Sequence, residues 1–261
     1  MTGVLQIMSA FNTNRFNLPA VTKNLIIINV MIWVVEALFP TFAINGLYRH
    51  CALHYVGASD FNPAQIITYM FLHDQRSFIH VFFNMFTLFM FGPILERTWG
   101  SKRFFMFYMV CGMGAALVQE GVWALTWEHD YISDLARLNG LTFDHMEQAL
   151  YAAIANHDMS LIQNMEMVKN SYITVGASGA IFGLLLGFAF VFPNMPLYLF
   201  FIPIPIKAKW MVIGYGVLEF FLGVNGGGTV AHFAHLGGML FGLIILLIWR
   251  RKGTLHGNGF Y

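Results

Sequence analysis

The sequence predicts an all-α protein that crosses a membrane several times. Hydrophobic residues make up 57% of the 261 residues and charged residues 10%, and the mean hydropathy is +0.62. This composition is far from that of soluble globular proteins and is typical of polytopic membrane proteins. A spanning helix needs about 17–25 apolar residues. Apolar stretches of roughly this length occur at 24–42, 78–95, 103–126, 176–192, 210–224 and 231–249.

The first apolar stretch is interpreted as a spanning helix rather than a cleavable signal peptide. Lys23 supplies the positive flank that a signal peptide has, but the apolar region is too long for one. Its removal would also leave five stretches and invert the alternation of loop charges. We therefore expect six spans.

Basic residues gather in alternate connections between the apolar stretches. They precede the first stretch, join the second to the third and the fourth to the fifth, and follow the sixth: Arg15, Lys23, Arg97, Lys102, Arg103, Lys207, Lys209, Arg250, Arg251 and Lys252. Cytoplasmic loops of membrane proteins carry the excess of Lys and Arg. The pattern therefore predicts cytoplasmic termini, 1–23 and 253–261, around a membrane domain of residues 24–252 in the plasma or inner membrane.

The connection between the third and fourth stretches, residues 127–174, is long and acidic. It carries seven acidic residues and two basic ones, and we expect it to face the side opposite the cytoplasm. Asp144 and Ser160 are each followed three residues later by Glu or Gln, ahead of apolar residues at helical spacing. This is a helix-start signal. The sequence predicts amphipathic helices on or near the outer membrane surface, more readily a structural cap than a device that recruits substrates.

The fourth stretch is short. Pro193 and Pro196 end it, while Pro203 and Pro205 precede the fifth stretch, so its helix has about 17 residues and a length of about 26 Å. Such a helix barely crosses the hydrocarbon core. A helix that begins below the outer surface leaves a recess above its first residues, where we expect water to reach Ser178.

Ser178 and His235 lie inside apolar stretches, where polar groups are costly and usually mark a site. Glycines repeat every four residues beyond each of them: Gly179, Gly183 and Gly187 in the fourth stretch, Gly238 and Gly242 in the sixth. Stripes of small residues bring membrane helices into close contact whatever their function. Here close contact would set the hydroxyl beside the imidazole, and a neighbouring general base makes serine an effective nucleophile.

A further polar pair lies in the second stretch. His80 and Asn84 are four residues apart and share one helix face, and both side chains can donate hydrogen bonds. With the backbone N–H of Ser178, at the positive end of its helix, they could hold an oxyanion. Taken singly, each is better explained by a structural role, as an asparagine that hydrogen-bonds between helices or a histidine with satisfied hydrogen bonds. The combination with Ser178 and His235 favours an active site.

These residues resemble motifs of the rhomboid family of intramembrane serine proteases. The similarity extends from about residue 61 to residue 242 and rests on four segments: Gly176-Ala-Ser-Gly179, His80-Val-Phe-Phe-Asn84, Gly92-Pro-Ile-Leu-Glu-Arg97 and Ala234-His-Leu-Gly-Gly-Met-Leu-Phe-Gly242. The segments with the polar residues occur in the family's order and on the expected helices. The resemblance implies a rhomboid-like bundle of six transmembrane helices, here with a long, helical loop between the third and the fourth.

The resemblance also implies a role for each residue. Ser178 is the nucleophile and His235 the general base, while His80 and Asn84 with the Ser178 amide form the oxyanion site. Phe182 stands where the family commonly has an aromatic ring beneath the catalytic histidine, although ordinary helix packing explains it equally well. The supporting glycines are Gly176, Gly179 and Gly238.

Two features depart from the family pattern. The 127–174 segment is unusual for compact members, and His232, one turn before His235, is a rival base that the Ala-His-x-Gly-Gly context disfavours. A metal site at the two histidines is disfavoured because the chain lacks a His-Glu-x-x-His motif, and we expect neither metal nor other cofactor. No acidic residue is evidently placed to orient His235, so the sequence predicts a Ser–His dyad rather than a triad.

Other polar residues in or near the apolar stretches are interpreted as structural. Glu120 and Glu219 are assigned to helix ends or to hydrogen bonds between helices. His73 and the Glu96–Arg97 pair are expected to tie the first loop and the end of the second helix.

The function that these expectations favour is a serine endopeptidase that cleaves single-pass transmembrane proteins in or near their membrane segments. We expect the lipid bilayer but no nucleic acid among its partners. A catalytically silent rhomboid relative that binds membrane clients would have lost the serine or the histidine, and this chain keeps both. A transporter would show inverted repeats or interrupted helices in matching halves, which the sequence lacks.

Overall fold

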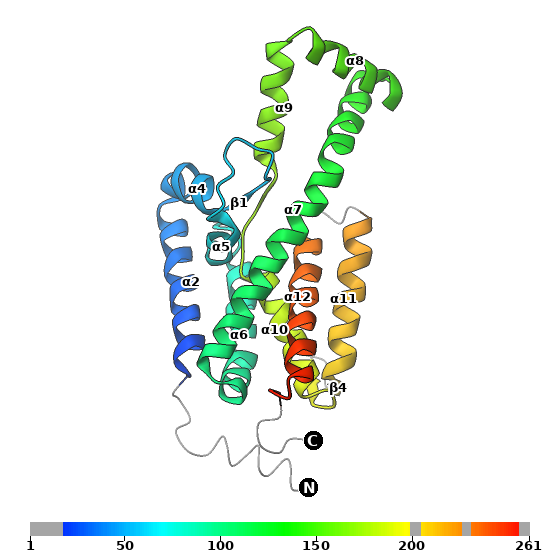
Figure 1. The fold of residues 1–261 in the computed structure, drawn as a ribbon. Coiled ribbons are helices and arrows are strands. Elements are labelled where there is room, and N and C mark those ends of the chain that lie inside the picture. Colours follow the sequence, from blue (N-terminus) through cyan, green and yellow to red (C-terminus); the bar gives the residue numbers. More distant parts are fainter. Residues whose placement is uncertain (1–17, 199–204, 226–230, 256–261) are drawn as a thin grey trace, which may run out of the picture.

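The structure, a computed structural model, describes residues 18–198, 205–225 and 231–255. This part of the chain is mostly helical (Figure 1). The longer helices are α2 (Ala20–Leu38), α6 (Phe78–Trp99), α7 (Ser101–Asn139), α8 (Phe143–Ala155), α9 (Met159–Ser171), α10 (Ser178–Val191), α11 (Ala208–Val224) and α12 (His232–Arg251). Arg15, Pro203 and the tail from residue 256, which the sequence analysis used, lie outside the described residues.

Short elements fill the connection between α2 and α6. They are α3 (Pro40–Phe42), a π-helical turn (Ala43–Tyr48), α4 (Arg49–Cys51), α5 (Gln65–Thr68) and a 3-10 turn (Tyr69–Phe71). Four strands of two or three residues each also occur among the described elements. They form two antiparallel pairs: β1 (Leu53–His54) with β2 (Ile173–Thr174), and β3 (Pro196–Tyr198) with β4 (Pro205–Lys207).

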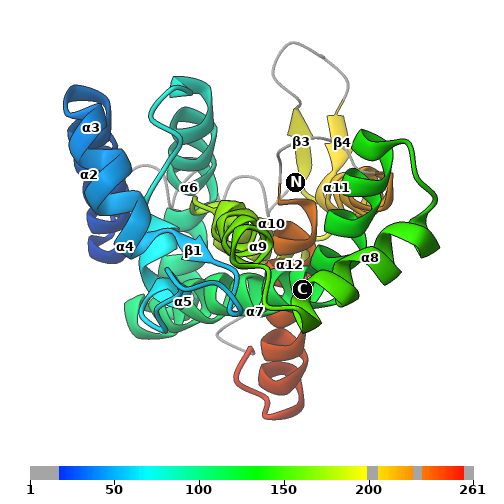
Figure 2. The same cartoon turned by 90° about the horizontal axis from the view of Figure 1, so that it is seen from above.

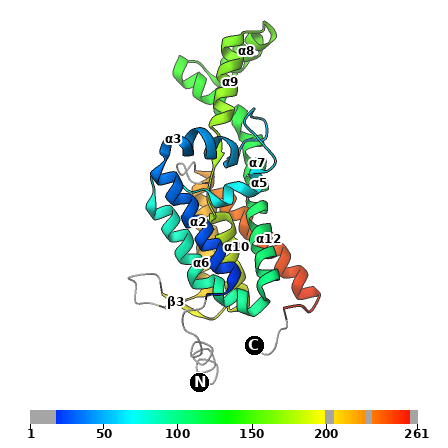
Figure 3. The same ribbon diagram turned by 90° about the vertical axis from the view of Figure 1, so that its left-hand side faces the viewer.

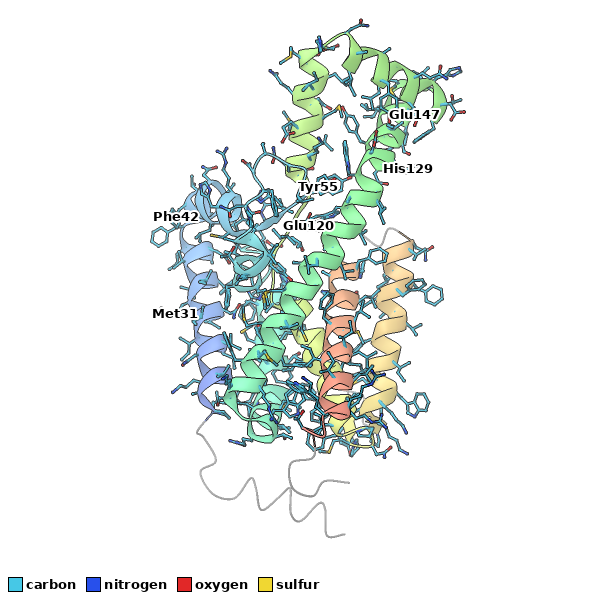
Figure 4. All side chains as sticks on the ribbon, in the orientation of Figure 1. Met31, Phe42, Tyr55, Glu120, His129 and Glu147 are labelled. Carbon is cyan, nitrogen blue, oxygen red and sulfur yellow. The ribbon has the colours of Figure 1, made fainter. Side chains whose placement is uncertain are left out.

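Four of the described helices, α2, α6, α7 and α12, are long and apolar enough to cross a membrane. The outward faces of the bundle are apolar as well. Met31 and Phe42, for example, are 63% and 57% exposed and point away from the other helices (Figure 4). These features mark the chain as an integral membrane protein.

Helix α10 lies at the centre of the bundle and packs against α6, α7, α11 and α12 (Figure 2). Glycines allow its backbone to touch that of α12. A Cβ added at Gly238 would lie 1.8 Å from the carbonyl oxygen of Gly179, and one added at Gly183 would lie 2.9 Å from that of Gly238. The close contact expected from the glycine stripes is therefore present.

Helix α7 continues beyond residue 126, where the sequence analysis ended the third span. It has 39 residues, a length of about 58 Å, and its outer half projects with α8 and α9 beyond the other helices (Figures 1 and 3). The projecting part, made of the outer half of α7 with α8 and α9, has its own small core: Tyr131, Ile132, Ala136, Met146 and Leu150. The helices expected in this segment are present, and they project beyond the rest of the bundle.

The starts of α8 and α9 differ by two residues from the expected helix-start signals. Thr142 caps α8 by accepting a hydrogen bond from the backbone N–H of His145, and Asp158 caps α9 by accepting from Ser160 and Leu161. Thr and Asp are good capping residues. Asp144 instead lies in the first turn of α8, where its charge suits the helix dipole.

Two buried carboxylates tie the helices to their connections. Glu96, near the end of α6, accepts hydrogen bonds from the backbone N–H groups of Val21 and Thr22 and so caps the start of α2. Glu120 accepts from the backbone N–H of Val56 at 2.7 Å, where the first loop meets α7 (Figure 4). Glu96 thus ties the end of α6, as expected, whereas Glu120 lies in the middle of α7 and holds a loop rather than a helix end or another helix.

Candidate active site

Ser178 is the first residue of α10 and is only partly buried. The turn before it requires glycine at position 176 for two reasons. The φ angle of Gly176 is +128°, which residues with a side chain rarely adopt, and a Cβ there would lie 2.9 Å from Nε2 of His80. This turn presents the Ser178 hydroxyl at the N-terminus of the helix, beside His80.

His235 lies in the first turns of α12, opposite Ser178. Its Nε2 is 2.8 Å from the Ser178 Oγ, a normal length for a hydrogen bond between a hydroxyl and an imidazole. His235 is 8% exposed. The contact between the glycines of α10 and α12 brings the two side chains together across 57 residues of sequence.

Phe182 fixes the plane of the His235 ring. The two rings are stacked, with centroids 4.2 Å apart and planes 5° from parallel. Tyr215 of α11 meets the Phe182 ring at 6.3 Å between centroids. Because His235 is held on its face by Phe182 and at Nε2 by Ser178, its ring has little freedom to turn.

His80 and Asn84 extend from α6, which packs against α10. A Cβ added at Gly176 would lie 2.9 Å from the Nε2 of His80 and 3.8 Å from the Ser178 Oγ. Both side chains therefore lie close to Gly176. Asn84 is 6% exposed, and its Nδ2 has no hydrogen-bond partner among the described residues. An unpaired buried donor costs about 1–3 kcal/mol, so such a donor calls for an explanation such as a ligand that supplies the acceptor.

His73 packs edge-on against His80, with ring centroids 5.2 Å apart. It lies in the connection before α6 and is fully buried. Burial, with a smaller contribution from His80, lowers the pKa of His73 to about 3. His73 is therefore a neutral ring that supports His80, and its backbone N–H donates to Glu36, which ties this connection to α2. This agrees with the structural role expected from the sequence.

Glu219 of α11 is the residue that the sequence analysis missed at this site. Its Oε2 is 2.6 Å from Nδ1 of His232 and 2.9 Å from Nδ1 of His235. The expected hydrogen bond between helices is present, but the expectation that no acidic residue reaches His235 was wrong. Within the described ranges, Glu219, His232 and His235 also form the group whose ligand atoms lie close enough together, within 4.8 Å, to surround a metal ion.

Comparison with protein families places these features in a known group. The model of the Rhomboid domain matches residues 61–126 and 145–252, well over half of the chain. The interruption, 127–144, covers the outer end of α7 and the start of α8, within the segment that departs from compact members. Comparison with curated protein sequences finds no match. The matched domain spans all the candidate site residues, and the chain belongs to the rhomboid family.

Proposed function

We propose that this protein is an intramembrane serine protease that cleaves single-pass transmembrane proteins in or near their membrane segments. The rhomboid family consists mostly of such proteases but includes inactive members. The observation that carries the proposal is the 2.8 Å contact between the Ser178 Oγ and Nε2 of His235. A silent client-binding protein has no need of this alignment, which favours activity over that alternative.

Each step of peptide hydrolysis has a group to perform it. The Ser178 Oγ attacks the carbonyl carbon of the scissile peptide while Nε2 of His235 takes the hydroxyl proton. The oxyanion that forms accepts hydrogen bonds from Asn84, His80 and the backbone N–H of Ser178. His235 then gives its proton to the leaving amine, which departs and leaves an ester on Ser178. Water hydrolyses the ester: His235 takes a proton from the attacking water and then returns it to the Ser178 oxygen as the carboxylic acid product leaves.

We further propose that six helices span the membrane, with α10 and α11 as the fourth and fifth. Helix α10 has 14 residues, a length of about 21 Å, which is shorter than the hydrocarbon core of about 30 Å. Ser178 at its start would then lie below the outer membrane surface, with a recess above it for water.

The distribution of basic residues supports cytoplasmic termini. The start of α2, the junction of α6 with α7, the start of α11 and the end of α12 lie at one end of the bundle (Figure 1). These are the places that carry Lys23, Arg97, Lys102, Arg103, Lys207, Lys209, Arg250 and Arg251. In agreement, Arg103 donates to the backbone carbonyl of Thr254 at 3.1 Å. By the positive-inside rule this end is cytoplasmic, and the active site opens to the opposite side.

The proposed substrates follow from the resemblance to the family. They are single-pass proteins of the plasma or inner membrane whose helices unwind easily near small residues. No nucleic acid or cofactor has a part in this reaction.

A fluorophosphonate probe tests the proposal directly, since it labels an activated serine without any need to know the substrate. We expect the purified wild-type protein in detergent to be labelled, and the Ser178→Ala and His235→Ala variants to remain unlabelled while still folded. A folded wild-type protein that takes up no probe and cleaves no model transmembrane substrate would instead be a silent client-binding relative.

A further inference from the structure

Glu219 belongs to a hydrogen-bonded cluster that includes the proposed general base. It extends from α11 to α12, where one of its oxygens, Oε2, contacts both His232 and His235. The cluster is well shielded, with side-chain exposures of 12% for Glu219, 8% for His232 and 10% for His235. A carboxylate is costly in such surroundings unless it is paired. The two imidazoles supply that pairing for Glu219.

The two histidines contact the carboxylate in different ways. His232 makes an aligned hydrogen bond through Nδ1 at 2.6 Å. His235 approaches the same oxygen at 2.9 Å, but its Nδ1 departs from the angle of an aligned hydrogen bond. Glu219 is thus anchored by His232 and held within reach of His235, on the opposite edge of the ring from Ser178.

This arrangement suits the task that His235 must perform. A carboxylate next to Nδ1 favours the tautomer with its proton there, which leaves the Nε2 lone pair free for the Ser178 hydroxyl. When Nε2 takes that proton, the ring carries a positive charge, and a carboxylate at hydrogen-bonding distance stabilises it. Glu219 would act at the moment when charge develops, which is where electrostatic stabilisation lowers a barrier.

The distances favour hydrogen bonding over metal binding. Ligand atoms of a tetrahedral zinc ion, each about 2.0–2.1 Å from the metal, lie about 3.3 Å from one another. The contacts of 2.6 and 2.9 Å share a single carboxylate oxygen and have the lengths of hydrogen bonds instead. Occupation by a metal is therefore an outcome that the test must distinguish.

We propose that Glu219 is a positioning residue for the general base: anchored by His232, it orients His235 and stabilises its protonated form during proteolysis. The inference rests on the proposed protease function and replaces the expected dyad by a Ser178–His235–Glu219 arrangement. Glu219 touches neither substrate nor the reacting atoms and acts only through His235.

The test compares two isosteric changes of shielded carboxylates. Glu219→Gln removes the charge next to His235, whereas Glu120→Gln removes that of a carboxylate whose hydrogen bond within the described residues goes to the backbone of Val56. For Glu219→Gln we expect the rate of fluorophosphonate labelling and the kcat for a model substrate to fall about 10- to 1000-fold, because loss of such a carboxylate leaves the wrong tautomer. KM should change less than about threefold. Glu219→Asp should recover part of the loss, and Glu120→Gln should lower Tm more than kcat.

The outcomes separate this inference from the function on which it rests. If Ser178 of the wild-type protein is not labelled, the protease function fails. If Ser178 is labelled and Glu219→Gln reacts at the wild-type rate, or loses activity only in proportion to its Tm, Glu219 is a structural tie and the inference alone fails. Loss of wild-type activity on chelation, restored by zinc, would also overturn the inference and make the cluster a metal site.

Discussion

Among the residues of the candidate site, Asn84 is a buried donor with nothing to donate to in the described chain. If its partner is the oxyanion, Asn84→Ala should lower kcat about 10- to 1000-fold with little change in KM, since removing one such donor costs a few kcal/mol in the transition state alone. Steady-state cleavage of a model transmembrane substrate measures both constants.

Asn29 supplies a matched control for this change. It is also a buried asparagine, but it lies on α2 and donates to the backbone carbonyl of Leu25 at 2.7 Å. Asn29→Ala should lower Tm and leave kcat near that of the wild type. If Asn84→Ala behaves in this way instead, Asn84 is a strut between helices.

The two histidines of α12 should differ in importance. His235→Ala removes the base and should abolish cleavage, whereas His232→Ala removes only one of the two contacts of Glu219 and should retain substantial activity. Parallel cleavage assays on the two folded variants measure the difference. Equal loss in both variants would mean that the base is misassigned or that both imidazoles take part in proton transfer.

The proximity of Ser178 and His235 could be predicted from sequence because each lies at the head of a glycine stripe, and such stripes let their helices pack closely. Glu219 could not be placed in this way. It lies on α11, whose glycines do not repeat every four residues, so its distance from His235 is decided by tertiary packing that one sequence does not reveal.

At the scale of helices, the contact between α10 and α12 sets the geometry of the site. A Cβ at Gly238 would meet the backbone of Gly179, which cannot yield as a flexible side chain can. Gly238→Ala should therefore destabilise the protein by about 1–3 kcal/mol through overpacking and should slow labelling of Ser178. Thermal unfolding in detergent, followed together with probe labelling, measures both effects.

Gly121 on α7 is the matched control, because a Cβ there meets nothing within 4 Å. Gly121→Ala should be neutral or stabilise α7 by up to about 1 kcal/mol, as the better helix former. Equal losses of Tm in both variants would show that the helix contact is less tight than these distances indicate.

The ends of the helices could be predicted where the sequence has strong breakers. Pro193 follows closely on the end of α10 at Val191, as expected. The end of α7 was misjudged because the helix continues from apolar into polar sequence without any breaker until Gly140, which adopts the left-handed conformation that ends it. Hydropathy locates the part of a helix that lies in lipid and does not reveal its continuation into water.

For the whole molecule, the decisive question is which side of the membrane supplies the hydrolytic water. We expect a membrane-impermeant thiol reagent to label cysteines introduced at Asn139, an exposed position on the projecting end of α7, in intact cells. A cysteine at position 257, beyond the described residues and after the C-terminal basic cluster, should be protected until the membrane is permeabilised. The native Cys51 and Cys111 are replaced by serine or alanine for this experiment.

The opposite pattern, with position 257 labelled in intact cells and Asn139 protected, would show that the protein has the inverted orientation in the membrane. The recess above Ser178 would then open to the cytoplasm, and the proposed substrates would be cut on that side.

Helix α11 is only loosely held in the bundle. Its buried residues are Ala208 and Val212, both near its start, and Phe220 and Phe221 on its outer part line an apolar hollow toward α10 and α12. Glu219, in the same outer part, joins α11 to α12 by contacts to both histidines. An outward movement of α11 would widen that hollow and withdraw Glu219 from His235 in one motion. If Glu219 orients His235 as proposed, the position of α11 therefore determines whether the base is aligned with Ser178.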